Sequence, residues 1–131
     1  MFTPRGDVAA VHFNHGGVNE AYIIGGFGKV ICKPLSSVER YDFDEDSWTE
    51  TSTEKLALVQ GRGDKIATVL DKKIYVIGGE DTHEDACDSP DALKPSEKSQ
   101  AIDNVEVFDP LAKSPLWELH SLISDSEERF R

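Results

Sequence analysis

The residues best suited to metal chemistry lie in one acidic segment of this 131-residue chain, residues 80–103. His83 and Cys87 stand close together there, with carboxylates on both sides, and imidazole and thiolate groups bind transition metals. Structural zinc sites, however, use four ligands, usually in paired Cys or His spacings. The alternating acids and central glycine of a calcium loop are absent as well. We therefore expect no metal here and interpret the segment as a flexible, solvated acidic loop.

Catalytic chemistry has little support in the sequence. The four histidines share no spacing with a nucleophile, and neither GxSxG nor HExxH occurs. Two glycine pairs, Gly25-Gly26 and Gly78-Gly79, invite comparison with phosphate loops, but no GxxxxGK[ST] or GxGxxG is present. We expect no enzyme activity, no catalytic residue and no cofactor. Each glycine pair is interpreted as the end of a strand where a neighbouring backbone or ring leaves no room for a Cβ.

The tripeptide Arg-Gly-Asp occurs twice, at residues 5–7 and 62–64. The tripeptide is known for receptor adhesion, but its recurrence at one repeat position favours a structural role. We expect the arginine and the aspartate to form a modest ion pair across or between the repeats. The glycine would then lie at the turn into the first strand.

These tripeptides and glycine pairs belong to a longer pattern that occurs twice. Each glycine pair follows a short apolar run, Tyr22-Ile23-Ile24 or Tyr75-Val76-Ile77. A Val-Glu pair, an aromatic residue and a tryptophan follow in both copies: residues 38–39, Tyr41 and Trp48, then residues 105–106, Phe108 and Trp117. The spacing differs between the copies only where loops are expected, as in repeat units with insertions.

Each copy of the pattern predicts four short strands. β-branched and aromatic residues fill these runs, and Gly, Pro, Asn, Asp or Ser lie between them. The predicted strands are 7–13, 21–25, 38–43 and 48–51 in the first copy, and 65–70, 74–78, 105–108 and 117–119 in the second. Four-stranded units that repeat after about fifty residues are typical of propeller blades.

The order of these motifs resembles the kelch repeat. The residues that carry the resemblance are Gly25, Gly26, Tyr41 and Trp48, and again Gly78, Gly79, Phe108 and Trp117. It implies an all-β fold with two four-stranded antiparallel blades of a kelch-type β-propeller, an incomplete ring. We expect the first blade at 1–57, the second at 58–124 with an acidic insertion at 80–103, and the start of a third repeat at 125–131. The aromatic residues of the motif are expected to pack between blades.

Two blades are fewer than the roughly four to eight of a closed propeller. The sequence therefore favours a fragment of a longer propeller. The alternative is a complete short protein that closes its ring as a homo-oligomer.

The resemblance implies a protein-interaction module that presents its loops to a partner protein. The loops expected to make contact are 27–37 and 81–103, with these residues as candidates: Phe27, Lys29, Cys32, Asp81, His83, Glu84 and Asp85. One alternative is a fragment of a kelch-like enzyme of the copper radical oxidase or sugar isomerase type. Another is a truncated product without an independent function.

The net charge of −11 argues against binding to nucleic acid or to an anionic membrane surface. The sequence has no apolar run long enough to span a bilayer and no signal-peptide pattern. We expect a cytoplasmic protein. Cys32 and Cys87 are the only cysteines. Because both follow a glycine pair in equivalent loops, a disulfide remains an alternative to the two free thiols that we favour.

Overall fold

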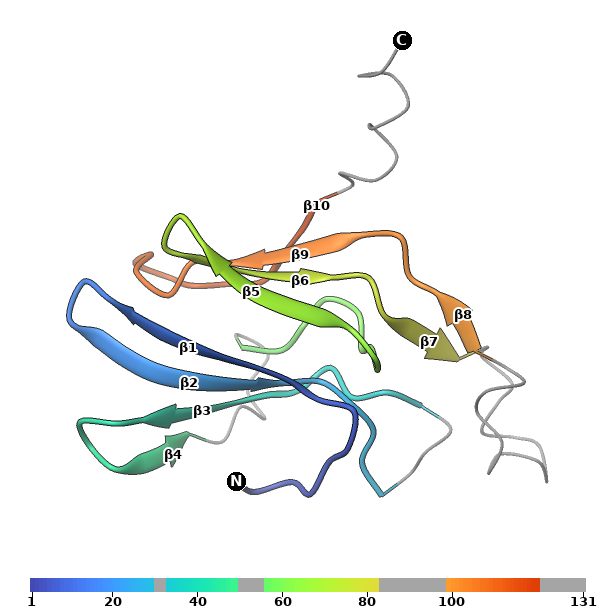
Figure 1. Cartoon of the computed structure of the whole chain (residues 1–131), viewed down its shortest axis with the longest axis horizontal. Helices are drawn as coiled ribbons and strands as arrows, with labels where there is room; N and C mark the ends of the chain where they lie inside the picture. Colours follow the sequence, from blue (N-terminus) through green and yellow to red (C-terminus); the bar gives the residue numbers. More distant parts are fainter. Residues whose placement is uncertain (30–32, 50–55, 83–98, 121–131) are drawn as a thin grey trace, which may run out of the picture.

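A computed structural model describes residues 1–29, 33–49, 56–82 and 99–120. These residues form two four-stranded antiparallel sheets and one two-stranded sheet (Figure 1). Within the same ranges, no helix is long and apolar enough to span a bilayer. The predicted all-β fold with two four-stranded blades is thus confirmed.

The first blade contains four strands paired in the order of the sequence. β1 and β2 are joined by Gly16 and Gly17, whose φ angles are 58° and 82°. A two-residue hairpin turn of this type needs positive φ at both positions, which glycine adopts without strain. The four strands are β1 (Ala9–His15), β2 (Val18–Ile24), β3 (Val38–Asp42) and β4 (Ser47–Thr49).

The second blade repeats this arrangement in the order β10-β9-β6-β5. Its first hairpin turns at Asp71 and Lys72, which take φ angles of 50° and 60° in place of the two glycines. The four strands are β5 (Ile66–Leu70), β6 (Lys73–Ile77), β9 (Val105–Phe108) and β10 (Glu118–His120). Each strand of the two four-stranded sheets therefore overlaps a run predicted from the sequence.

The insertion of the second blade departs from the solvated loop that the sequence suggested. Its two ends pair as the antiparallel strands β7 (Glu80–Thr82) and β8 (Ser99–Ala101). The pairing satisfies backbone donors and acceptors that a loop would leave to water. Residues 83–98 lie outside the described ranges.

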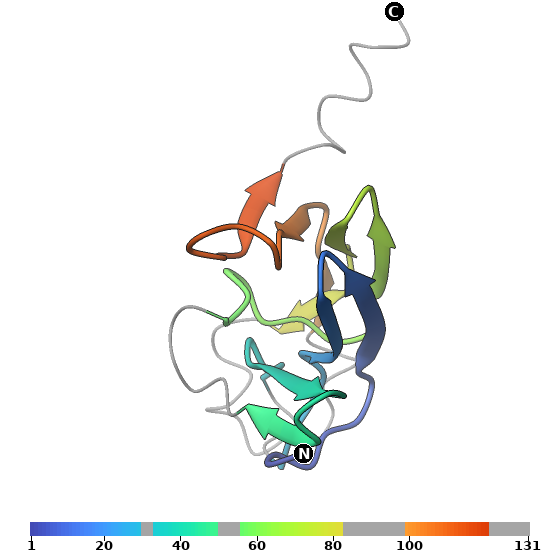
Figure 2. The same cartoon turned by 90° about the vertical axis from the view of Figure 1, so that its left-hand side faces the viewer.

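The two blades pack face to face, with the edge strands β1 and β5 side by side (Figures 1 and 2). Burial alternates along the strands: Ile74 and Val76 in β6 are fully buried, whereas Ile77 is 37% exposed. Such alternation places one face of a sheet in the core. The buried cluster between the blades consists of Ala9, Phe13, Tyr22, Ile24 and Val38 from the first blade, with Leu58, Ile74, Val76, Phe108 and Trp117.

Candidate functional site

The candidate interaction loops leave the sheets at one end of the molecule, which we call the loop end. It comprises residues 2–7, 25–29, 33–37, 58–64, 78–82 and 99–104. The opposite end, which we call the turn end, carries the hairpin turns at 16–17, 43–46 and 71–72 and the β9–β10 connection. In Figure 1 the loop end lies to the right, with the β7–β8 hairpin.

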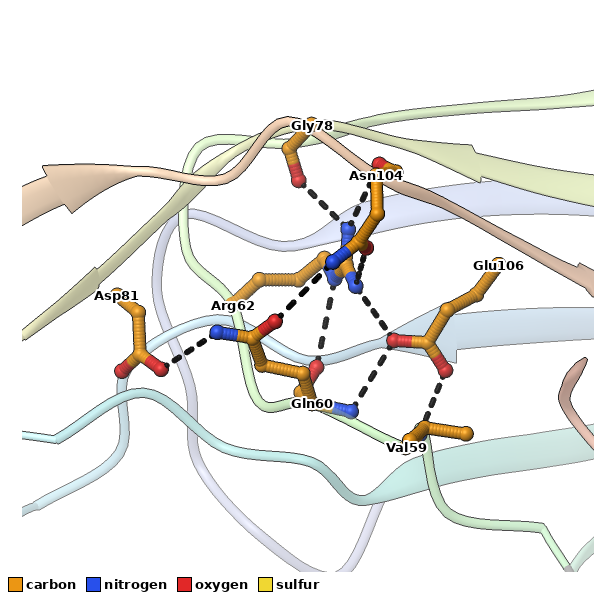
Figure 3. A network of polar contacts seen from close by, with 7 residues as sticks. All are labelled: Val59, Gln60, Arg62, Gly78, Asp81, Asn104 and Glu106. Carbon is orange, nitrogen blue, oxygen red and sulfur yellow. Dashed lines mark hydrogen bonds and ion pairs between the residues drawn. The ribbon is translucent and has the colours of Figure 1, made fainter. Parts of the chain in front are cut away.

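At the base of the loop end, Arg62 and Glu106 form a fully buried ion pair (Figure 3). Arg62 Nη2 lies 2.5 Å from Glu106 Oε2, and Nη1 donates to the carbonyl of Gly78 at 2.9 Å. The carboxylate also accepts the backbone N–H groups of Val59 and Gln60, at 2.5 and 3.1 Å. The pair therefore ties the segment before β5 to the ends of β6 and β9.

The network extends from this pair to the β7–β8 hairpin (Figure 3). Arg62 Nη2 donates to Asn104 Oδ1 at 2.7 Å, and Asn104 Nδ2 donates to Gln60 Oε1 at 3.3 Å. Gln60 Nε2 in turn donates to Asp81 Oδ2 at 2.9 Å. Asp81, a candidate contact residue, thus anchors the start of the insertion to the blade beneath it.

The first blade contains an equivalent ion pair with the same kinds of backbone bonds. Arg5 Nη2 lies 2.9 Å from Glu39 Oε2, and Nη1 donates to the carbonyls of Gly25 and Ser37 at 3.1 and 2.9 Å. Glu39 accepts the backbone N–H groups of the two residues that precede Pro4. Burial lowers the pKa of the Arg5 guanidinium, and the Glu39 carboxylate opposes this shift. Both loops of the loop end therefore start from the same buried support.

The arginine and the aspartate of each Arg-Gly-Asp tripeptide were expected to form an ion pair, but the structure gives the arginines other partners. Each arginine pairs with a glutamate of β3 or β9. The aspartates instead occupy left-handed backbone, with φ angles of 51° at Asp7 and 47° at Asp64, a conformation that Asp tolerates better than most residues. The sequence signal for the true partners was the Val-Glu pair that occurs in both copies.

The glycine pairs lie where the backbone turns and neighbouring chains come close. Gly25 and Gly26 have φ angles of 59° and 89°, and Gly78 and Gly79 have 61° and 99°. A Cβ on Gly25 would lie 2.7 Å from the carbonyl oxygen of Arg62. At Gly78 the nearest atom would be 3.5 Å away, so there the positive φ is the stronger reason for glycine.

Phe27 packs across the seam between the blades. Its backbone forms an isolated antiparallel bridge with Gly6, and its ring lies against Gly63 of the second blade so closely that a Cβ there would overlap it. Lys29, two residues further on, is exposed. A shallow pocket of about 430 Å³ lies beside them, lined by Thr3, Pro4, Arg5, Gly6, Phe27, Gly28 and Lys29.

The rest of the first loop holds the blades together. Leu35 accepts the backbone N–H of Arg62 at 3.3 Å, and Ser36 accepts that of Leu58 at 2.8 Å. A Cβ on Gly61 would lie 2.6 Å from the carbonyl oxygen of Pro34. Residues 34–36 are thus bonded to the segment that enters the second blade. Within the described part of this loop, the exposed residues are Lys29, Lys33 and Ser36.

Lys65 is a buried amine between the blades that the sequence analysis did not single out. It is 7% exposed, and its Nζ donates to the backbone carbonyl of Asp7 at 3.1 Å. Burial, followed by the charge of Arg5, lowers its pKa to about 8. The equivalent residue of the first copy is Val8, so the repeat comparison gave no signal for this lysine.

The aromatic residues of the repeat are buried to different extents in the two blades. Phe108 and Trp117 are 1% and 5% exposed and stack with ring centroids 5.1 Å apart. Phe108 also lies 5.8 Å, centroid to centroid, from Tyr22 of the first blade. Tyr41 and Trp48, at the equivalent positions, are only half-buried. The difference arises because the first blade covers Phe108 and Trp117.

Several candidate contact residues fall outside the described ranges. These are Cys32, His83, Glu84 and Asp85, and Cys87 lies there too. Among the residues that the structure does describe, no group of three or more His, Cys, Asp or Glu side chains is arranged to hold a metal ion.

Comparisons with known proteins agree with the repeated blade. The kelch motif model matches residues 19–53. The F-box/kelch-repeat protein At4g39580 of Arabidopsis thaliana is 34% identical over 122 residues, which cover 93% of this chain and 24% of that protein. This chain therefore spans about a quarter of the length of that relative.

Among solved structures, that of YjhT superposes with a TM-score of 0.63 at 17% identity. The match covers 89% of this chain and 37% of YjhT. At this level of identity the likeness shows the fold, a kelch propeller. Together with the repeated glycine pairs, aromatic residues and four-stranded sheets, these matches show a kelch-type propeller fold with a kelch motif at residues 19–53.

Proposed function

We propose that this chain is a protein-interaction module whose loop end binds a partner protein. Kelch scaffolds are in general protein-interaction modules. The observation that carries the proposal is the buried Arg–Glu network, which occurs in both blades and fixes the start of both loops. Side chains held on such a rigid base lose little conformational freedom when they bind.

The contact surface that we propose consists of the exposed Lys29, the neighbouring pocket and the β7–β8 hairpin. The pocket is lined mainly by apolar groups, and the exposed Lys29 is one of its lining residues. An apolar side chain of the partner next to a carboxylate would suit this combination. The F-box/kelch-repeat relative supports the proposal in that its name joins kelch repeats to an F-box, so that its repeats form one part of a larger protein.

The proposal can be tested by comparing the two ends of the molecule. A photo-crosslinking residue would be placed at Lys29 or, as a matched control, at Lys113 of the turn end, since both lysines are exposed. Proteins captured from a lysate only through the Lys29 position would be identified, purified and titrated against the chain by calorimetry. We expect Lys29→Glu and Gln100→Lys to weaken that binding tenfold or more, and Lys113→Glu to leave it unchanged.

Two results would contradict the proposal. One is capture of the same proteins, in equal amounts, from both positions. The other is a purified partner whose affinity falls with Lys113→Glu but not with the two loop-end substitutions.

A further inference from the structure

We propose that a groove between the two blades at the turn end binds a small carboxylate ligand with an apolar body. The groove is a pocket of about 450 Å³, and pockets of this size hold small molecules. The first blade lines it with Arg40 and Thr49, and the β9–β10 connection of the second blade lines it with residues 113–116. Both walls therefore belong to described elements of this chain. The groove is also separate from the loop end, where we propose that a partner protein binds.

The groove is basic, although the chain carries a net charge of −11. Arg40 and Lys113 line it, one from each blade, together with the hydroxyl residues Thr49 and Ser114. Among the described residues, no aspartate or glutamate lines it. Two cations beside hydroxyl donors favour an anionic ligand by charge complementarity.

The Arg40 guanidinium keeps hydrogen-bond donors available for such a ligand. Its Nε lies 3.7 Å from Glu20 Oε1, and its Nη2 donates to Thr49 Oγ1 at 3.5 Å, so both contacts are long. The guanidinium groups of Arg5 and Arg62, in contrast, are fully buried with carboxylate oxygens at 2.9 and 2.5 Å. Because the Arg40 side chain is 31% exposed, an incoming carboxylate can accept two of its N–H groups side by side, the geometry in which arginine binds carboxylates most strongly.

Arg40 does not belong to the repeated framework of the blades. The buried arginine and glutamate of each blade recur in the other, whereas Arg40 corresponds to Val107 in the second copy. Strand register places Arg40 opposite Tyr22 and Thr49, and Tyr22 belongs to the core between the blades. The blade itself therefore does not require a cation at this position, and the binding of an anion explains it.

The remaining lining residues are apolar. Leu56 lines the groove and packs against the core between the blades. Pro115 and Leu116 line it as well, and Leu116 is 52% exposed. Since covering such apolar surface removes it from water, the groove should prefer a carboxylate with an alkyl or aromatic body to a bare anion such as acetate.

The two tryptophans provide a local signal for a ligand in the groove. The indole Nε1 of Trp117 donates to the carbonyl of Leu56 at 3.1 Å, so a ligand that packs on Leu56 should change the environment of this N–H group. Trp48 lies next to Thr49 in β4 and thus points to the other face of the sheet. The two indole N–H resonances therefore distinguish binding in the groove from binding elsewhere.

Titration of the isotope-labelled chain, residues 1–131, with octanoate tests the proposal by nuclear magnetic resonance. We expect a saturable shift of the Trp117 indole N–H and little change at Trp48. Octan-1-ol lacks the charge and acetate lacks the alkyl chain, so each should bind more weakly by about tenfold or more. Octylamine, which carries the opposite charge, should give no saturable shift.

Substitutions of Arg40 test which residue binds the carboxylate. Arg40→Gln should weaken octanoate binding by about tenfold or more, because the charge-assisted hydrogen bonds are lost. Arg40→Lys keeps the charge and should lose less. The matched control is Lys72→Met, since Lys72 is exposed in the β5–β6 turn and does not line the groove, and its affinity should equal that of the wild type. Circular dichroism would check that each variant keeps its β structure.

Any of four results would overturn the proposal. The first is a wild-type chain without a saturable shift at Trp117, the result expected if the chain itself fills the groove. The second is octylamine that binds as tightly as octanoate. The third is an octanoate affinity that Arg40→Gln leaves unchanged in a folded chain. The fourth is a shift at Trp48 as large as that at Trp117, because the ligand would then lie outside the groove.

Discussion

Arg62 and Glu106 lie 2.5 Å apart, Nη2 to Oε2, with both side chains fully buried. The first blade repeats the pair as Arg5 and Glu39. A buried ion pair contributes little net stability, because desolvating the two charges offsets their attraction. Each carboxylate, however, also accepts two backbone N–H groups from the segment ahead of its blade. The pair therefore fixes which segment packs at the base of each loop.

Removing one partner of this pair should strongly destabilise the chain. Arg62→Ala leaves the Glu106 carboxylate buried without its cation, and we expect the free energy of unfolding to fall by about 3–5 kcal/mol. Urea denaturation followed by circular dichroism measures the change. The matched control is Arg40→Ala, because the Arg40 side chain is 31% exposed and its Nε lies 3.7 Å from Glu20 Oε1. Such a partly exposed pair contributes about 1 kcal/mol or less.

The double substitution Arg62→Met with Glu106→Leu removes both charges at once. It should cost less than the sum of the two single substitutions, since no unpaired charge is left behind. If the loss in free energy of unfolding for the double variant equals the sum of the losses for the two single variants, the two side chains do not act as a unit.

A Cβ at Gly63 should be poorly tolerated, whereas one at Gly6 should be harmless. The two glycines occupy the same place in the two tripeptides, but only Gly63 lies under the Phe27 ring, and no atom lies within 4 Å of a Cβ at Gly6. We expect Gly63→Ala to lower the free energy of unfolding by about 1–3 kcal/mol. Gly6→Ala should change it by about 0.5 kcal/mol at most. Equal effects in thermal melts would exclude the contact with Phe27 as the cause.

The two tryptophans of the repeat should differ in their contribution to stability. Trp117 is 5% exposed and its indole Nε1 donates to the carbonyl of Leu56 at 3.1 Å, so Trp117→Ala should cost about 3–5 kcal/mol. Trp48 is half-buried, and Trp48→Ala should cost less than about 2 kcal/mol in the monomer. Chemical denaturation at a concentration where the chain is monomeric measures both values. Equal losses would show that the first blade is covered on both faces.

Lys65 should make the chain more stable as the pH rises above neutrality. Its pKa is 10.5 in the unfolded chain and about 8 in the folded one, so between these values the unfolded chain binds more protons. Stability therefore rises with pH across this window, by about 1–3 kcal/mol when complete. Urea midpoints measured between about pH 7.5 and 9.5 should show the rise. The measurement stops at pH 9.5 because of Tyr22. Burial, with the Glu20 hydrogen bond, raises the pKa of Tyr22 in the folded chain, so above about pH 10 its titration makes the stability fall as the pH rises.

Lys65→Met should flatten this pH dependence and raise the stability at pH 7. Lys73→Met is the matched control, because Lys73 is exposed, and it should retain the wild-type slope. A wild-type chain whose stability falls steadily from pH 7.5 to 9.5 would contradict the burial of the Lys65 ammonium.

The strands could be predicted because local residue types determine them. Apolar runs that end at Gly25 and Gly78 overlap β2 and β6, and the repeat placed the remaining strands of each blade. The pairing of β7 with β8 could not be predicted in this way, because Glu80–Thr82 and Ser99–Ala101 are mostly polar. These strands are held by their hydrogen bonds to each other and by the bond from Gln60 to Asp81.

The partner of each arginine could have been predicted from alternation along a strand. Glu106 and Phe108 lie two residues apart in β9 and thus on one face, and that face is buried in the core. A glutamate on a core face requires a buried partner. The unequal burial of Trp48 and Trp117, in contrast, depends on which blade covers which face, and equivalent repeat positions do not contain that information.

The pairing of β7 with β8 fixes both ends of the peptide that joins them. Thr82 and Ser99 face each other across the hairpin, so the peptide that joins them begins and ends at positions already held at strand spacing. Closing a longer peptide between fixed ends costs only about 0.6 kcal/mol for each doubling of its length. A change in the length or sequence of that peptide should therefore leave the hydrophobic interior between the blades as it is.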